Sequence, residues 1–134
     1  MKAHGQGWPY PHLFEGAVEV IVGGNETEFL AAALRGLEAQ RQAAEHNIAN
    51  VETPGFRARR VSFESALRHA IVAGDPGRAG ITTSTSTAPG RIDGSNVDLQ
   101  REVTSLELNA LHQQLVTEAL NARYTRLRTA IGRT

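Results

Sequence analysis

The last third of the chain carries two apolar rows with helical spacing. The first row advances mostly in steps of four and three residues and contains Leu99, Val103, Leu106, Ala110, Leu120, Tyr124, Leu127 and Ile131. It lapses at Gln113 and Thr117, where polar residues take the expected positions. The second, offset row contains Leu108, Leu111, Leu115, Ala119 and Ala122. Steps of three and four keep side chains on one side of a helix. Since a surface helix needs only one apolar face, two rows predict a long helix with at least two packing partners.

A second helix with the same spacing is predicted earlier in the chain. Its apolar positions are Leu30, Leu34, Leu37, Ala44, Ile48 and Val51. Asn25 is a favourable N-cap, and Pro54 ends the helix because it disfavours helical angles at Thr53. Arg41 interrupts the apolar series. It either fixes the register of a helix pair or lies along the edge of the seam with its guanidinium in water.

The residues between the two helices differ in composition. The alternation of Arg57, Arg59, Val61 and Phe63 indicates a short extended segment, and a short helix is expected from there to Val72. Residues 74–94 are rich in Gly, Pro, Ser and Thr, which favours a loop or a weak hairpin. Ser95 and Asp98 then match a capping box at the start of the long helix.

These patterns predict a mainly α fold. Two long terminal helices, 25–53 and 95–134, form one structural domain as an antiparallel pair of the coiled-coil type. Residues 54–94 form a flexible middle, with room for a short β-hairpin. Residues 1–24 are an N-terminal extension. Val18–Val22 within it is a short β-prone run, but we expect disorder or loose packing there.

Charge and composition narrow the class of function. The chain has 14 basic and 14 acidic residues, so it lacks the positive excess that binds nucleic acid or anionic membranes. No apolar run is long enough to span a bilayer, and Glu15 and Glu19 interrupt the segment where a secretory signal would lie. Aromatic residues are 5% of the chain, few for a self-sufficient core, so we expect other chains to supply part of the burial.

Candidate catalytic chemistry is lacking. The histidines are His4, His12, His46, His69 and His112, and no two have the spacing of helical metal ligands. Nucleophile elbows, phosphate loops and dinucleotide glycine patterns are missing from the sequence. We therefore predict a protein that is not an enzyme and uses no cofactor or metal.

Two stretches carry a family resemblance. The sequence from His46 to Phe56, HNIANVETPGF, resembles the Asn-Ile-Ala-Asn…Thr-Pro-Gly-Phe/Tyr signature near the N-terminus of flagellar rod and hook proteins. Residues 96–102, followed by Tyr124 and Leu-Arg-Thr-Ala-Ile-Gly at 127–132, resemble the C-terminal region of the proximal rod members of that family. Matched by position, the motif residues are Asn47, Ile48, Asn50, Thr53, Pro54, Gly55 and Phe56.

The resemblance implies a structural subunit of the bacterial flagellar basal-body rod. In that family the terminal helices pack with those of neighbouring subunits to form the tube of the drive shaft. The implied partners are copies of the chain, other rod proteins, a FliE-like adaptor, and the MS ring and export gate. The resemblance also implies export by the flagellar type III apparatus to the periplasmic rod. The seam residues expected to serve assembly are Leu30, Leu34, Leu37 and Ile48, with Leu99, Val103, Leu106, Leu108, Leu111, Leu115, Leu120, Tyr124, Leu127 and Ile131.

Two alternatives stay open. Another rod protein shares the first motif, although the ending at 127–132 favours a proximal rod member. A small helical adaptor or export chaperone would bind one partner helix through the same apolar rows. The extension before residue 25 also departs from the family, whose members enter the first helix soon after their start. It either contacts a neighbour, or translation begins later.

Overall fold

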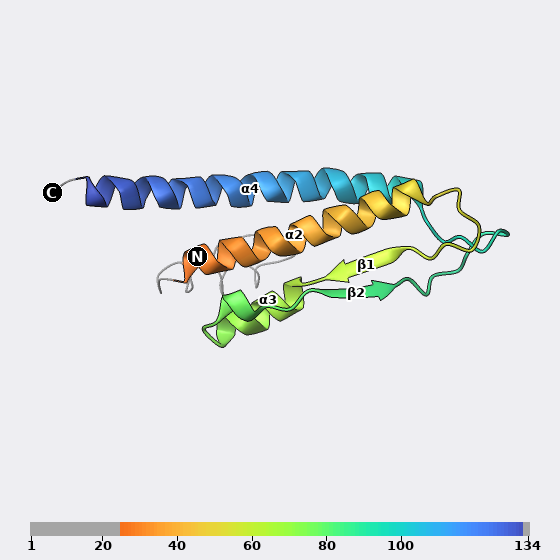
Figure 1. The fold of residues 1–134 in the computed structure, drawn as a ribbon, viewed down its shortest axis with the longest axis horizontal. Helices are drawn as coiled ribbons and strands as arrows, with labels where there is room; N and C mark the ends of the chain where they lie inside the picture. The colour runs from red at the N-terminus through yellow and green to blue at the C-terminus, as the bar shows by residue number, and fades with distance from the viewer. Residues whose placement is uncertain (1–24, 133–134) are drawn as a thin grey trace, which may run out of the picture.

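Two long helices and a small sheet make up the fold of residues 25–132, the part of the chain that the computed structural model describes (Figure 1). The elements in chain order are α2 (Glu26–Ala49), β1 (Arg59–Ser62), α3 (Glu64–Val72), the 3-10 turn η1 (Pro76–Arg78), β2 (Thr82–Thr85) and α4 (Leu99–Ile131). The mainly α class is therefore confirmed. The expectation for residues 1–24 lies outside the described residues.

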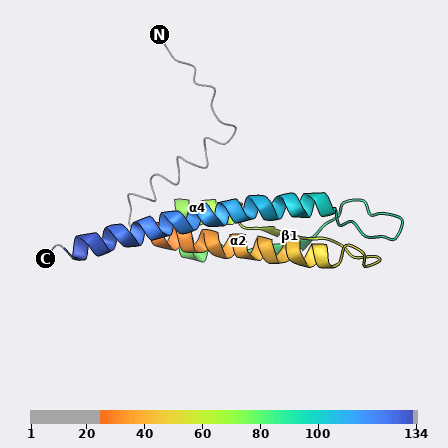
Figure 2. The ribbon, with the colours of Figure 1, turned by 90° about the horizontal axis from the view of Figure 1, so that it is seen from above.

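Helices α2 and α4 lie side by side and run in opposite directions (Figures 1 and 2). Glu26, at the start of α2, meets Arg123 and Arg126 near the end of α4. At the other end of the pair, Asn47 of α2 meets Glu102 in the first turn of α4. α4 has 33 residues and α2 has 24, so the C-terminal end of α4 projects beyond α2 (Figure 2).

The remaining elements lie on α2 as a further layer (Figure 1). β1 pairs with β2 in antiparallel register, from Arg59 opposite Thr85 to Ser62 opposite Thr82. The sheet therefore joins strands on either side of α3 and η1, and β2 lies within residues 74–94, which were expected to form a loop or a weak hairpin. The extended segment and the short helix expected before Val72 are present as β1 and α3.

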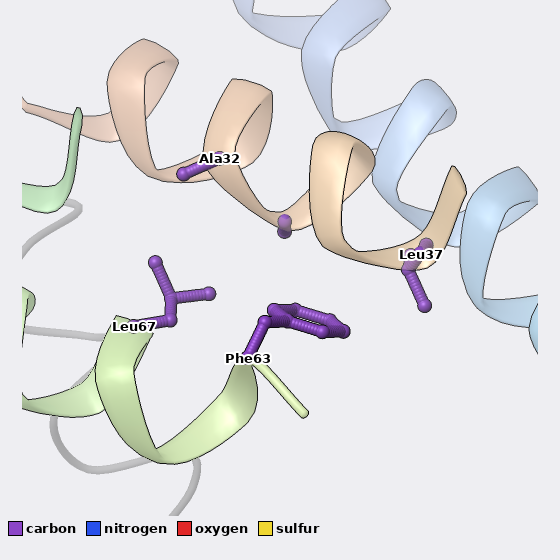
Figure 3. Packing of buried hydrophobic residues seen from close by; sticks show 5 residues of the cluster. Ala32, Leu37, Phe63 and Leu67 are labelled. Carbon is purple, nitrogen blue, oxygen red and sulfur yellow. The ribbon is translucent and has the colours of Figure 1, made fainter. Parts of the chain in front are cut away.

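A small core joins α2 to α3. Its buried side chains are Ala32, Ala33, Leu37, Phe63 and Leu67 (Figure 3). Val116 of α4 is partly buried against the same cluster. The alanines let the two helices approach closely, and Phe63 is the largest side chain of the cluster.

Gly36 is required by this close approach. A Cβ added there would lie 2.2 Å from Cδ2 of Phe63, whose ring is held by the core. We expect Gly36→Ala to lower the free energy of unfolding by about 1–3 kcal/mol, because overpacking outweighs the better helix propensity of alanine. Urea denaturation followed by circular dichroism measures the change. Gly80→Ala is the control, since nothing lies within 4 Å of its added Cβ; a Gly36→Ala chain as stable as this control would contradict the packing.

The ends of the helices differ from the sequence expectations. Asp98, rather than Ser95, caps α4, and its Oδ1 accepts a hydrogen bond of 3.1 Å from the backbone N–H of Arg101. Asn25 precedes α2 as expected, but its side-chain amide donates to the carbonyl of Gly74 at 2.8 Å. The two differences have separate causes. Asn25 is held by a contact 49 residues away, whereas the hydroxyl of Ser95 is buried and has no hydrogen-bond partner among the described residues.

The line of α4 that faces α2 differs from the predicted apolar row. The less exposed positions of α4 are Glu102, Leu106, Asn109, Gln113, Val116, Leu120 and Arg123, again in steps of four and three. Only three of these seven are apolar. Leu99, Val103, Tyr124 and Leu127 of the predicted row are instead exposed. Polar residues can occupy the α2-facing line because they find buried partners there, as the amide of Asn109 does at the carbonyl of Leu37 (2.9 Å).

On α2 the burial of the predicted apolar positions is closer to expectation. Leu30 and Leu37 are buried, whereas Leu34 and Ile48 are partly buried. Arg41 forms ion pairs along its own helix with Glu38, at 2.6 Å, and with Glu45. The hydrogen bond from Arg41, with a second from Gln42, holds the pKa of Glu38 down at about 2. Arg41 therefore lies at the edge of the helix pair and does not fix its register.

Candidate functional site

Asn47 is the buried centre of the motif at the end of α2. Its side-chain amide donates to the carbonyl of Arg59 at 2.9 Å, and its Oδ1 accepts from the Arg59 N–H at 2.8 Å. The same amide donates to Oε2 of Glu102 at 3.1 Å. Asn47 thus satisfies both backbone groups of one β1 residue, as a neighbouring strand would, and ties α2 to β1 and α4.

Glu102 completes this arrangement from α4. Its side chain is 2% exposed, and its Oε1 accepts a hydrogen bond of 2.6 Å from Nη1 of Arg60. A buried carboxylate is costly unless it is paired and hydrogen-bonded, and here both oxygens have partners. We call Asn47, Arg60 and Glu102, with the backbone of Arg59, the buried polar network. It joins three elements at one end of the helix pair.

The rest of the motif reverses the chain. The amide of Asn50 donates to the carbonyl of His46 at 2.8 Å, which satisfies a carbonyl at the end of α2. Gly55 has a φ of +70°, which glycine adopts without strain, and its N–H donates to the carbonyl of Asp93 at 2.8 Å. The ring of Phe56 returns to α2 and lies 5.5 Å from the ring of His46, centroid to centroid. These contacts fix how the chain leaves α2.

Asn96 is a functional candidate that sequence reasoning did not single out. Its Oδ1 accepts from the N–H of Ala58 at 2.7 Å, and its amide donates to the carbonyls of Ser86 and Ala88 at 3.1 and 3.0 Å. Asn96 therefore ties the segment before α4 to the backbone of other segments, as Asn47 ties α2 to β1 and α4. It lies in the second stretch that resembles rod proteins, and that was its only signal in the sequence. Arg60 and Glu102 had no local signal for pairing, because they lie 42 residues apart.

An exposed apolar row follows the side of α4 that points away from α2. Leu108, Leu111 and Leu115 are 53%, 52% and 55% exposed. Their steps of three and four keep them on one side of the helix, about half a turn from the line that contains Asn109 and Val116. We call these three residues the outer leucine row. It corresponds to the second apolar row of the sequence, which was expected to need a further packing partner.

Other kinds of site are not indicated between residues 25 and 132. No group of three or more His, Cys, Asp and Glu side chains there is placed to hold a metal ion. A cleft of about 230 Å³ lies between α2, β1 and α4, and Glu102 and Asn109 are among the residues that line it. Within the same range, none of the helices has the length and apolar content that would let it cross a membrane.

Comparison with known proteins assigns the class. No model of a protein family matches the chain. The flagellar basal body rod protein FlgB of Bacillus subtilis strain 168 is 28% identical over 116 residues, covering 76% of this chain and 89% of that protein. FlgB of Escherichia coli K12 is 32% identical over 122 residues, covering 70% and 88%. FlgB of Aeromonas hydrophila is 35% identical over 102 residues, covering 63% and 76%.

The helical fold and these relatives define a structural protein of the flagellar basal-body rod. The resemblance found in the sequence is thereby confirmed. Within that class, the chain belongs to the FlgB family of flagellar basal body rod proteins.

Proposed function

We propose that this chain is a subunit of the proximal rod and that its terminal helices assemble with neighbouring subunits into the axial tube. The observation that carries the proposal is the outer leucine row, which leaves apolar side chains on the surface of a chain whose relatives are rod proteins. A contiguous exposed apolar row usually marks an interaction site. The row runs along the length of a helix, and the surface it offers is therefore suited to another helix.

The helix pair supports this role as a rigid unit. α2 and α4 act as a pair of the coiled-coil type, in which polar contacts fix the register while apolar side chains remain outside. The pairs Asn109–Leu37 and Glu26–Arg123 hold the two helices at separate points along their length. Polar groups within a helix pair restrict it to one alignment, at some cost in stability. The outer leucine row therefore has a fixed position relative to the rest of the chain.

The motif residues from Asn47 to Phe56 position this unit against the rest of the chain. The proposed partners are copies of this chain and other rod proteins, with a FliE-like adaptor, the MS ring and the export gate at one end of the rod. The proposed route is export by the flagellar type III apparatus to the periplasmic rod. The family of the chain supports these assignments.

A small helical adaptor or export chaperone is the alternative, because the outer leucine row would also accept one partner helix. The two functions differ in where the protein resides at the end of assembly. A rod subunit remains in the finished basal body, whereas an adaptor or chaperone is left behind.

Deletion of the gene in its host tests the proposal. We expect cells without filaments and without swimming in soft agar, with both restored by the intact gene on a plasmid. A tagged copy that restores swimming should co-purify with detergent-extracted hook–basal bodies. Normal filaments in the deletion strain, or a functional tagged chain that is absent from purified basal bodies, would favour the adaptor.

A further inference from the structure

A second exposed apolar row follows α4 on a different side from the outer leucine row. It starts at Leu99 and Val103, which are 49% and 41% exposed, and it ends at the exposed Ala110. A helix turns by about 100° per residue, so these three side chains lie within about 40° of one another. We call Leu99, Val103 and Ala110 the side row. They belong to the first apolar row of the sequence, and α2 leaves them exposed.

The side row points away from the sheet as well as from α2. It lies about 100° round the helix from Asn109, which faces α2. Ser105 and His112 line the cleft beside β1, and they lie on the opposite side of α4 from the side row. The outer leucine row lies about 130° beyond the side row, so the two rows point in clearly different directions.

A polar strip separates the two apolar rows. Its members share the sector of α4 between Val103 and Leu111, and all of them are exposed: Gln100, Glu107, Gln114 and Glu118. Charged and amide side chains in this sector divide the apolar residues into two surfaces, because one broad apolar face would be continuous there. Besides its contact with α2, α4 therefore has two distinct apolar surfaces.

Two surfaces that point in different directions suit a series of identical subunits. When the outer leucine row of one copy packs against the side row of the next, the same contact repeats from subunit to subunit and covers both rows. A contact between like rows of two copies would close after two subunits and leave the other row exposed. A tube built from copies of one chain requires the repeating kind of contact.

The dimensions and composition of the rows agree with such a contact. The side row is about 16 Å long from Leu99 to Ala110, and the outer leucine row is about 10 Å long from Leu108 to Leu115. Every member of both rows is aliphatic, so their contact buries no charge. The small side chain of Ala110 leaves room for a leucine of the facing helix to insert.

We propose that the outer leucine row of one copy packs, head to tail, against the side row of the next copy. This inference rests on the proposed function, and it specifies which two surfaces of neighbouring subunits meet in the rod.

Site-specific photo-crosslinking in assembled rods tests the proposal. A benzophenone amino acid replaces Val103 in a tagged chain, which is expressed beside the natural gene so that natural copies complete the rods. Irradiation of purified hook–basal bodies should give a covalent dimer of the chain. Cleavage after glutamate separates residues 108–118 from 103–107, and we expect the adduct to lie in 108–118 of the neighbouring copy.

Two further probe positions complete the design. A probe at Leu111 examines the same contact from the other row, and its adduct should lie before residue 108 of the neighbouring copy. Ser105 is the matched control, since it is exposed but lies on the opposite side of α4 from the side row. We expect the probe at Val103 to give at least about fivefold more dimer than the probe at Ser105, because packing raises the effective concentration of the reacting groups.

The position of the adduct separates the possible occupants of the side row. Adducts that join residues 103–107 of two copies would show a contact between like rows, and adducts only with a different protein would show that another component covers the side row. Either result, or equal dimer yields from Val103 and Ser105, would overturn the proposal. The natural chain with the same tag tests the function separately: if it is present in basal bodies, a failure of the crosslinks counts against this contact alone.

Discussion

Replacing Leu111 and Leu115 together by glutamate is expected to abolish swimming while leaving the isolated chain folded. Both side chains point away from α2 and are about half exposed, so the charges cost little in the free chain. Glutamate is a good helix former, and the like charges at three- and four-residue spacing, including those with Glu107 and Glu118, should together cost about 1 kcal/mol. An apolar contact with a neighbouring subunit would instead have to bury two carboxylates without partners, at a cost of several kcal/mol.

Soft-agar swimming and counts of filaments by electron microscopy measure the functional loss, and thermal denaturation by circular dichroism checks the fold. The matched control is Gln114→Glu with Asn121→Glu, which adds two charges at exposed polar positions of the same helix. Normal swimming of the leucine variant would remove the outer leucine row from assembly. Truncation of Leu106 or Leu120 to alanine is a less selective test, because these residues are partly buried and lie on the line that faces α2.

Asn47→Ala is expected to have the largest effect on stability. The change leaves the N–H of Arg59 without its side-chain partner, leaves the Arg59 carbonyl with only a longer hydrogen bond of 3.3 Å from Arg60, and removes one hydrogen bond from the buried Glu102. Each buried polar group that loses its partner costs about 1–3 kcal/mol, and Arg59 is itself exposed, so we expect a loss of about 2–4 kcal/mol, a large part of the stability of a small domain.

Urea denaturation followed at 222 nm measures this loss. Asn50→Ala is the control within the same motif. Its side chain is only partly buried. It donates to one carbonyl of its own helix and accepts an exposed hydrogen bond from the hydroxyl of Thr53, so the loss should be about 1 kcal/mol. Asn47→Asp should be no better than Asn47→Ala, since it places a second carboxylate against Glu102. Equal losses for Asn47→Ala and Asn50→Ala would contradict the central place of the buried polar network.

The periodicity of the sequence was sufficient to predict which segments are helical, but it did not show which side of α4 meets α2. Apolar spacing identifies the sides that avoid water, and α4 has more than one such side. Which side of α4 packs against α2 depends instead on where polar side chains find hydrogen-bond partners. Asn109, for example, donates to the carbonyl of Leu37, 72 residues away. Pairings at that separation leave no trace in local spacing.

The motif from Asn47 to Phe56 was likewise only partly predictable from the sequence. Its resemblance to rod proteins marked Asn47, but the reason for an asparagine there is the backbone of Arg59 and the carboxylate of Glu102, both supplied by other elements. Ser95 and Asn25 were expected to cap helices for local reasons. Ser95 is instead buried in the loop before α4, and Asn25 contacts the loop after α3. Residues with several possible hydrogen-bond partners are the ones whose roles only the tertiary structure assigns.

The contact between α2 and α4 has a thermodynamic consequence that follows from its polar character. Opening this pair hydrates amides and carboxylates as well as aliphatic groups, and the two kinds of surface change the heat capacity with opposite sign. The heat-capacity increment of unfolding should therefore be small for a chain of this length. A small increment gives a shallow, broad stability curve, so that cooling and moderate warming alter the folded fraction little.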